Sequence, residues 1–189
     1  MKYDLNKKPT KFAVRVLKDL SDELFNALTR KHLESITVNE ICEATNYPRA
    51  TFYNYFNDIY DLLDYCFYLM TKDINLQPDP SLKGTDRVEV LVSRVYDYLD
   101  AKRDRIEKYL EFNPTDGLFV SKLHSHTSKV ILDFVANDHN GELTPLQSEI
   151  IAEHVANTCQ LIFKRCFDKG SKLTKDQAID ALRYLVGNL

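Results

Sequence analysis

The most informative part of the sequence is residues 37–56, which read Thr37-Val-Asn-Glu-Ile-Cys-Glu-Ala-Thr-Asn-Tyr-Pro-Arg-Ala-Thr-Phe-Tyr-Asn-Tyr-Phe56. It opens on the pattern of a capping box, in which the hydroxyl of Thr37 accepts the amide of the third residue and Glu40 reaches back. Asn46 tolerates the left-handed conformation that ends a helix, and Pro48 can begin a helix but cannot continue one. The stretch therefore predicts a short helix, a turn and a second short helix over residues 49–55.

This helix–turn–helix pattern is typical of DNA-binding proteins, whose second helix enters the major groove. Arg49 is of the residue type that pairs bidentately with guanine, and the methyl group of Thr51 is suited to contact thymine. Tyrosine and asparagine side chains further along can reach phosphates, which fixes the register without reading the sequence. Two alternatives stay open, since Arg49 can be merely solvated and the tyrosines can be packing residues. The candidate DNA-contacting residues of the motif are Thr37, Arg49, Ala50, Thr51, Tyr53, Asn54 and Tyr55.

Apolar residues recur at helical spacing along the rest of the chain, and no segment alternates with a period of two. We therefore expect an all-α protein of about nine helices. One helix precedes the motif over about Thr10–Arg30, and Asn57 is placed to cap the helix that follows it. The strongest break is the segment Asn75–Thr85, which holds two prolines and a glycine. Beyond it the expected helices lie near residues 86–101, 102–112, 116–137, 145–169 and 174–186.

The break divides the chain into two expected domains. The first covers residues 1–70 and contains the helix–turn–helix at residues 37–56, and the second covers residues 71–189. Phe52 and Phe56 lie on one helix face and are expected to pack the second motif helix onto its neighbours.

The net charge of the 189-residue chain is −3, which excludes a generally basic protein that coats nucleic acid. The charge is unevenly distributed, because residues 1–18 hold six basic residues against one acidic residue, a net +5. Residues 61–189 carry a net −4. The chain therefore combines a basic N-terminal segment with an acidic body, as expected for a local rather than a general contact with DNA.

The sequence carries no signal for export, a membrane span, a metal site or catalysis. Residues 1–10 are polar, and no apolar run approaches the roughly 18 residues that span a bilayer. The four cysteines form no C-x-x-C pair, and His124 and His126 face different sides of a helix. No acid pair, nucleophile–base set or glycine-rich phosphate loop occurs at workable spacing. We therefore expect a cytoplasmic protein without membrane contact, metal, cofactor or enzymatic activity.

The motif resembles the helix–turn–helix of TetR-family transcriptional regulators, and the resemblance covers residues ~10–70. The family pattern has a T-V-x-x-I-A opening, a G-V-S-type turn and a T-[LF]-Y-x-[HY]-F close followed by an acidic-Leu pair. Thr51-Phe-Tyr-Asn-Tyr-Phe56 and Asp61-Leu62 satisfy the close. Three residues depart from the pattern: Asn46 replaces Gly, Pro48 replaces a capping Ser, and Ile59 replaces a common Lys that supports a phosphate contact.

The resemblance implies a repressor that binds a near-palindromic operator of double-stranded DNA as a homodimer and is released by an effector. It also implies that the N-terminal arm and first helix lie near the DNA backbone. Lys7, Lys8 and Lys11 are therefore candidate phosphate contacts, the alternative being a solvated terminus. Pro48 and Ile59 leave a different function open, namely a helical dimeric interaction protein that has lost operator binding.

The second domain holds two further candidate surfaces. The helix over residues 145–169 is apolar around so much of its circumference that it needs partners on both sides. The resemblance implies that the last two helices pair with their copies in the dimer. The candidate interface residues are Ile151, Val155, Thr158, Ile162, Phe163, Cys166, Ile179, Leu182, Leu185 and Val186. The resemblance also implies a pocket for a small-molecule effector of unknown identity, the alternative being a filled core. The candidate pocket residues are Tyr96, Tyr109, Phe112, Phe119 and Phe134.

Overall fold

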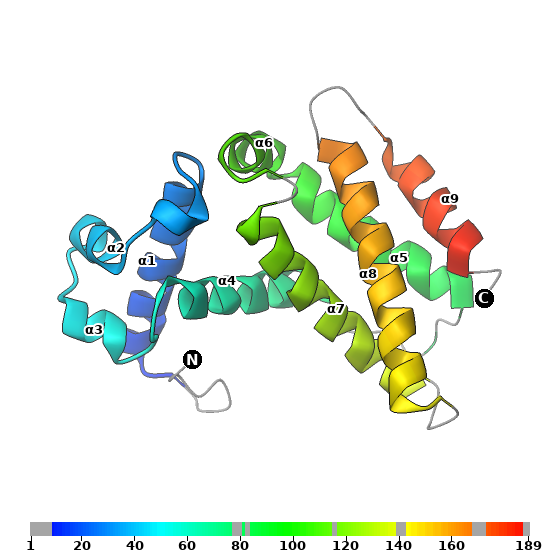
Figure 1. Ribbon diagram of the computed structural model, residues 1–189, viewed down its shortest axis with the longest axis horizontal. Helices are drawn as coiled ribbons and strands as arrows, with labels where there is room; N and C mark the ends of the chain where they lie inside the picture. Colours follow the sequence, from blue (N-terminus) through cyan, green and yellow to red (C-terminus); the bar gives the residue numbers. More distant parts are fainter. Residues whose placement is uncertain are drawn as a thin grey trace.

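The chain folds into helices joined by short connections (Figure 1). The computed structural model describes residues 9–76, 81, 84–114, 117–138, 143–167 and 173–186. The side chains of residues 84, 85, 87, 88, 137, 138, 185 and 186 lie outside this description. Within these limits there are nine α-helices, one short 3-10 helix and no strand, so the expected all-α class is confirmed.

The helices agree closely with the segments expected from the sequence. The third helix is shorter than expected and ends at Tyr53, two residues before the end of the predicted range 49–55. The elements in chain order are α1 Lys11–Leu28, η1 Leu33–Ser35, α2 Val38–Thr45, α3 Arg49–Tyr53, α4 Ile59–Ile74, α5 Gly84–Asp100, α6 Arg103–Phe112, α7 Leu118–Asp138, α8 Pro145–Phe167 and α9 Lys175–Val186.

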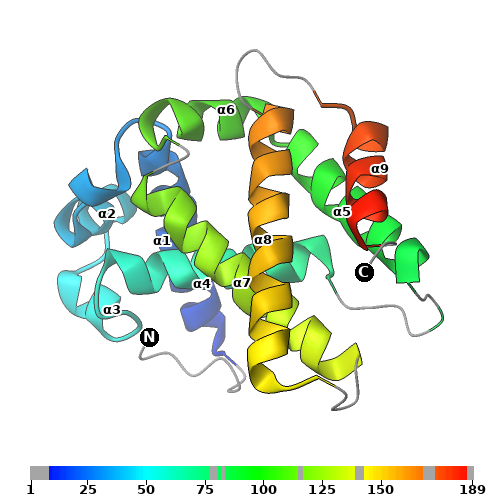
Figure 2. The same cartoon turned by 45° about the vertical axis from the view of Figure 1, so that its right-hand side comes forward.

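We call α1 to α4 the head and α5 to α9 the body. Figures 1 and 2 show α4 extending out of the head and passing beside α7, so this helix links the two parts. Because α4 runs unbroken to Ile74, the expected boundary after residue 70 falls inside it. The division into two domains stays a prediction.

The head is built on one apolar core to which each of its four helices contributes. Leu20 of α1, Ile41 of α2, Phe52 of α3 and Leu63 of α4 are all fully buried. Phe56 is buried as well, with its ring centroid 5.6 Å from that of Phe52. The expectation that these two phenylalanines pack the short third helix is therefore confirmed.

Local side-chain contacts fix the ends of the head helices. The Thr37 hydroxyl accepts the Glu40 amide at 3.2 Å, but the Glu40 carboxylate pairs with Lys31 at 2.8 Å, so only half of the expected capping box forms. Asn46 takes the left-handed conformation at φ 57°, as expected. The expected cap at Asn57 is wrong. Asp58 caps α4 by accepting the Asp61 amide at 2.9 Å, because its extended backbone places the carboxylate over the first turn.

The body contains two helix pairs, α7 with α8 and α5 with α9, and the shorter α6, which contacts α5 and α8 (Figures 1 and 2). Ala152 and Ala156 of α8 are buried, since small side chains let two helices approach closely. Two capping boxes form here: Thr144 and Gln147 bond reciprocally at the start of α8, as do Thr174 and Gln177 at the start of α9. Within the described part of the chain, no helix is both long and apolar enough to cross a membrane.

Candidate nucleic-acid interface

The short helix α3 presents its outer residues to solvent. Arg49, Ala50 and Asn54 are exposed, whereas Thr51, Tyr53 and Tyr55 are half-buried. The opposite face of the helix is held by the fully buried ring of Phe52. In Figures 1 and 2, α3 lies at the same end of the head as the N-terminal end of α1. The candidate DNA-contacting residues of α3 are therefore exposed or partly exposed on a helix that is fixed to the core.

Arg49 rests against a neighbour on its own helix. Its Nη2 donates to the Tyr53 hydroxyl at 3.3 Å, and its guanidinium carbon lies 5.8 Å from the centroid of the Tyr53 ring. The hydrogen bond to Tyr53 raises the pKa of Arg49, so the side chain stays cationic. Because the contact is at the surface, exchanging it for a base edge or a phosphate costs little.

The turn before α3 is fixed by Tyr47, a residue that the sequence reasoning did not select. Its backbone amide donates to the Cys42 carbonyl at 3.0 Å, which closes the end of α2 around the left-handed Asn46. Its hydroxyl donates to Asp19 of α1 at 2.8 Å, and this bond raises the pKa of Tyr47. The two contacts join the turn to α1 and so set the direction of α3. An aromatic residue within a turn was the only available signal.

The cations at this end of the head are partly balanced by acidic neighbours. Arg15 lies 3.7 Å from Asp19, and Lys18 lies 2.5 Å from Asp22, each one helical turn away. Lys11 is exposed in the first turn of α1, and Thr37 is exposed at the N-terminus of α2. The candidates Lys7 and Lys8 lie outside the described residues.

The two departures that raised doubt about DNA binding have different structural settings. Pro48 occupies the N-cap position of α3 without a side-chain hydrogen bond, as expected from the loss of a serine hydroxyl. Ile59 is only 6% exposed and belongs to the apolar core of the head. The isoleucine therefore anchors the start of α4 in the core that it shares with the other head helices.

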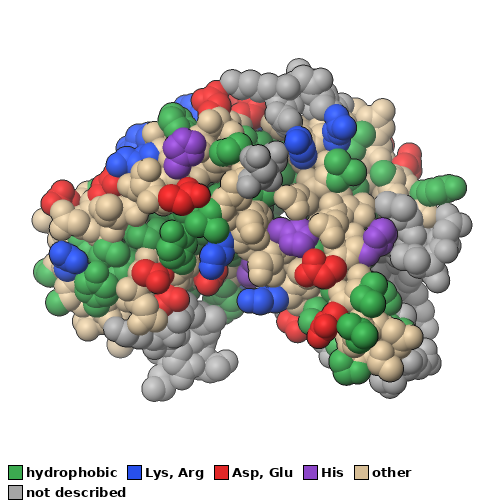
Figure 3. Space-filling model, in the orientation of Figure 1, with side chains coloured by type: hydrophobic (Ala, Val, Ile, Leu, Met, Phe, Trp, Pro, Cys, Tyr) green, Lys and Arg blue, Asp and Glu red, His purple; other side chains and the backbone are tan. Residues whose placement is uncertain are grey.

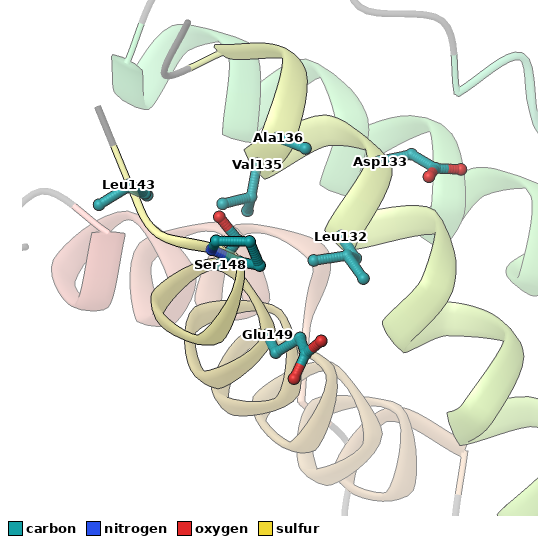
Figure 4. Close-up of a pocket in the computed structure, with 8 residues that line it drawn as sticks. Leu132, Asp133, Val135, Ala136, Leu143, Ser148 and Glu149 are labelled. Atoms are coloured by element: carbon teal, nitrogen blue, oxygen red, sulfur yellow. The ribbon is translucent and has the colours of Figure 1, made fainter. Parts of the chain in front are cut away.

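The five candidate effector residues are dispersed through the packing of the body. Tyr109 and Phe119 are buried with ring centroids 6.2 Å apart, and Tyr96 lies 6.2 Å from Phe167. Phe112 and Phe134 are half-buried. A hollow of about 460 Å³ lies elsewhere, between the end of α7 and the start of α8 (Figure 4). Its lining residues are Leu132, Asp133, Val135, Ala136, Leu143, Pro145, Ser148 and Glu149.

The candidate dimer residues fall into three groups. Cys166, Ile179 and Leu182 are 2%, 8% and 5% exposed and pack inside the protomer. The half-buried residues are Ile151, Val155, Thr158, Ile162 and Phe163, and the side chains of Leu185 and Val186 lie outside the description.

Other apolar side chains project from α8 and α9 into solvent. Leu146 is 66% exposed, Ile150 61%, Leu161 55% and, on α9, Tyr184 75%. Figure 3 shows hydrophobic side chains gathered over the end of the molecule where α8 begins. These most exposed apolar side chains of α8 and α9 are not among the candidate interface residues, whose role stays a prediction.

The histidines and cysteines have separate surroundings. His124 lies 3.1 Å from Asn157, whereas His126 lies 2.7 Å from the Thr71 hydroxyl on α4. Cys66 is fully buried, and burial raises the pKa of its thiol to about 12, so it is an unreactive core residue. Among the side chains that the structure describes, no group of three His, Cys, Asp or Glu is placed to hold a metal ion.

No family model matches the chain, and no curated protein matches it significantly. Solved structures do match over nearly the whole length. The fatty acid degradation regulator FadR from Bacillus halodurans is 15% identical with a TM-score of 0.62, over 95% of this chain and 96% of that one. A TetR-like transcriptional regulator from Rhodococcus sp. RHA1 is 15% identical with a TM-score of 0.57, over 96% and 97%.

The transcriptional repressor QsdR of R. erythropolis, a TetR-family protein, is 14% identical with a TM-score of 0.57, over 95% of this chain and 96% of that one. At these identities the likeness shows the fold. The fold expected from the resemblance to TetR-family regulators is therefore confirmed over both the head and the body.

Proposed function

We propose that this chain is a sequence-specific DNA-binding transcriptional regulator that acts as a homodimer in the cytoplasm. The observation that carries the proposal is α3, a short helix with Arg49 and Ala50 exposed, the exposed Asn54 directly after it and a fully buried phenylalanine on the opposite side. A helix that is rigidly supported and exposed along its length is suited to enter the major groove. The shared fold with solved transcriptional regulators supports the same conclusion.

Base readout and phosphate contact fall to different residues in this proposal. Arg49 leaves Tyr53 to pair with a guanine edge, and the small Ala50 and the methyl group of Thr51 allow close approach to the base pairs. Phosphate contacts come from Thr37, Tyr53, Asn54 and Tyr55 and from the N-terminal cations Lys7, Lys8 and Lys11. Only Arg49 and its neighbours on α3 thus determine which sequence is preferred.

The homodimer forms through the outer face of α8. Leu146, Ile150 and Leu161 lie on one side of this helix with more than half of their surface exposed, and Tyr184 extends the face onto α9. The half-buried Ile151, Val155 and Ile162 lie on the flank of α8 between this side and the buried Ala152 and Ala156. A two-fold axis across α8 brings the apolar side chains of one copy against those of the other and removes them from water.

The regulator acts as a repressor that is released by an effector. Tyr109 and Phe119 support this proposal, because they join head and body: Tyr109 stacks on Phe25 of α1 at 6.1 Å, and Phe119 lies 5.8 Å from Phe67 of α4. A ligand that separates these rings moves the head relative to the body. It lowers affinity for DNA only if it binds the DNA-incompetent arrangement more tightly.

Selection from randomised duplexes with the purified protein tests the proposal. We expect an enriched inverted repeat with half-sites about 34–36 Å or a multiple apart. Arg49→Ala should cost about 1–3 kcal/mol of binding free energy and relax the preference at one position of each half-site. Lys11→Ala should weaken binding to all sequences alike and flatten its dependence on salt.

Arg30→Ala is the matched control. Arg30 is an exposed arginine that lies just after the C-terminal end of α1, away from α3, and it pairs with Glu23. It should leave the selected sequence unchanged. No enriched inverted repeat, together with near-zero affinity for any duplex at low salt, would favour the interaction protein without operator binding. Pro48, which leaves α3 without a side-chain cap, is the observation that motivates that second function.

A further inference from the structure

A single buried asparagine joins the body to the head. Asn113 follows the last turn of α6 and is 3% exposed. Its Oδ1 accepts the Leu33 amide at 2.9 Å, and its Nδ2 lies 3.2 Å from the Leu28 carbonyl and 3.3 Å from the Lys31 carbonyl. These three partners form the connection between α1 and η1, about eighty residues away in sequence. From this geometry we propose that Asn113 is a positioning residue that sets the angle of the head on the body.

The chemistry of the site requires an amide. The head connection offers one donor, the Leu33 amide, and two acceptors, the carbonyls of Leu28 and Lys31. A carboxylate at position 113 could still accept but has no proton to donate, and an apolar side chain could do neither. Because the site is buried, water cannot replace the lost partners. Asn113 also reaches the Tyr109 carbonyl at 3.3 Å, which ties its side chain to α6.

Neighbouring contacts show that α6 grips the end of α1 at more than one point. Arg105 donates to the Asn26 side chain at 3.0 Å, and its guanidinium carbon lies 5.5 Å from the Phe25 ring centroid. Phe25 in turn stacks on Tyr109 at an interplanar angle of 23°. We call Asn113, Arg105 and Tyr109 with their partners on α1 and η1 the clasp. It is a second connection between head and body, separate from α4.

Because the clasp lies far from α3, a small rotation at the clasp displaces α3 by several ångströms. The clasp holds the C-terminal end of α1, whereas α3 lies toward the other end (Figures 1 and 2). An α-helix of 18 residues is about 27 Å long, so a rotation of about 10° at the clasp moves the far end by about 5 Å. Successive base pairs are about 3.4 Å apart, so this displacement exceeds one step along DNA. The inference for DNA binding rests on the proposed function: in the dimer, the clasp determines which spacing between the two half-sites is bound.

The distance between head and body tests the clasp without DNA. Spin labels on non-natural amino acids at the exposed positions Ala44 of α2 and Ser125 of α7 report this distance by double electron–electron resonance. Labelled chains are diluted in unlabelled chains, so that only distances within one chain are read. We expect a narrow distribution for the native protein and, for Asn113→Asp, a distribution broader by several ångströms, about the movement that a 10° rotation gives.

Asn39→Asp is the matched control, because Asn39 is exposed and its side chain bonds only within α2, to Glu43. It should leave the distribution narrow. Arg105→Ala removes an outer part of the clasp and should broaden the distribution to a smaller degree, and it decides the test if Asn113→Asp does not fold. A folded variant of either kind with the native distribution would overturn the proposal.

Selection from duplexes with randomised half-site spacing gives the functional readout. Native protein should enrich one spacing, and Asn113→Asp should enrich several spacings while retaining the same half-site sequence. A merely structural role would lower the yield of folded protein and leave the spacing preference unchanged, which would contradict the proposal. If the native protein enriches no site at all, the proposed DNA-binding function fails, and the spin-label distances still decide whether the clasp holds the head.

Discussion

In the head, the largest fully buried side chains run from Val16 of α1 to Phe67 of α4 and form a continuous core, whereas Phe12 and Val14 of α1 are exposed outside it. In the body, every side chain of α5 from Glu89 to Tyr96 is half-buried. The body also exposes Ile150 at 61% of its surface. The two parts thus have similar helices but a different degree of burial.

This difference indicates whether the apolar side chains of each part are covered within the protomer. The head encloses its own core, so α3 has a rigid support whether or not a partner is present. The body leaves Leu146, Ile150 and Leu161 of α8 exposed and many other side chains partly covered, which is compatible with the proposed contact to a second copy. The enclosed core of the head and the exposed apolar side chains of α8 can therefore be tested by separate substitutions.

The largest effect is expected from truncating the head core. Phe52→Ala should lower the free energy of unfolding by about 3–5 kcal/mol, because Phe52 is fully buried and the tight core cannot close the cavity. The matched change in the body, Phe163→Ala, removes a half-buried ring and should cost roughly 1–2 kcal/mol. Urea denaturation followed by circular dichroism measures both. Equal losses would remove the distinction between the two parts.

A charge on the exposed face of α8 should affect assembly rather than folding. Ile150→Glu buries two carboxylates across the proposed two-fold axis and should weaken the dimer by about 3 kcal/mol, roughly 100-fold in its dissociation constant. Phe12→Glu is the control, since Phe12 is 62% exposed but lies on the head. Light scattering over a range of concentrations should give a monomer mass for the first variant and a dimer mass for the second. A monomer mass for the native chain at all concentrations would contradict the dimer.

The head could be predicted closely from the sequence because its signals are local. The cap at Thr37, the left-handed Asn46 and the buried pair Phe52 and Phe56 depend on neighbours within one or two helical turns. The cap of α4 was misassigned by one residue, since Asn57 and Asp58 are adjacent residues of the type that caps helices.

The long-range contacts could not be predicted in the same way. Helical periodicity finds apolar faces, but α8 is apolar on several sides, so the sequence does not say which face meets the protomer and which meets a partner. Cys166 of α8, for example, is a candidate interface residue in the sequence and is buried in the protomer. The bonds of Asn113 and Tyr47 join residues far apart in sequence, and a single polar residue carries no periodic signal.

The contact between α4 and α7 should make stability depend on pH. The Thr71 hydroxyl donates to the Phe67 carbonyl at 3.0 Å, so the His126 ring, 2.7 Å away, donates its Nε2 proton to that hydroxyl. Burial lowers the pKa of His126, with Lys129 acting in the same direction and Asp64 opposing. The unfolded chain therefore binds a proton more readily than the folded one. The free energy of unfolding therefore has its full value at pH values above the histidine pKa in the unfolded chain, about 6.5, and it decreases as the pH falls through that pKa.

His126→Gln keeps a hydrogen-bond donor without a titrating group and should flatten this dependence between pH 7.5 and pH 5.5. Urea denaturation at the two pH values measures it, and His32→Gln is the control because His32 is exposed on the head. The prediction would be wrong if the native protein were equally stable at both pH values. It would also be wrong if His32→Gln flattened the pH dependence more than His126→Gln does.

The smallest expected effects decide whether head and body unfold together. Thr37→Ala removes the cap of α2 in the head, and Thr174→Ala removes the cap of α9 in the body. Each should cost about 1 kcal/mol. The buried residues of both parts, from Leu20 in the head to Phe119 and Phe167 in the body, belong to one continuous cluster. We therefore expect one thermal transition, lowered by about 2–4 °C in either variant.

Two calorimetric steps, with each substitution lowering only the step of its own part, would mean instead that the shared cluster and the clasp do not couple the two cores. In that case the greater burial in the head would be a property of an independent domain. A single step moved equally by both caps would mean that the fully buried head also stabilises the less buried body through α4, Phe119 and Asn113.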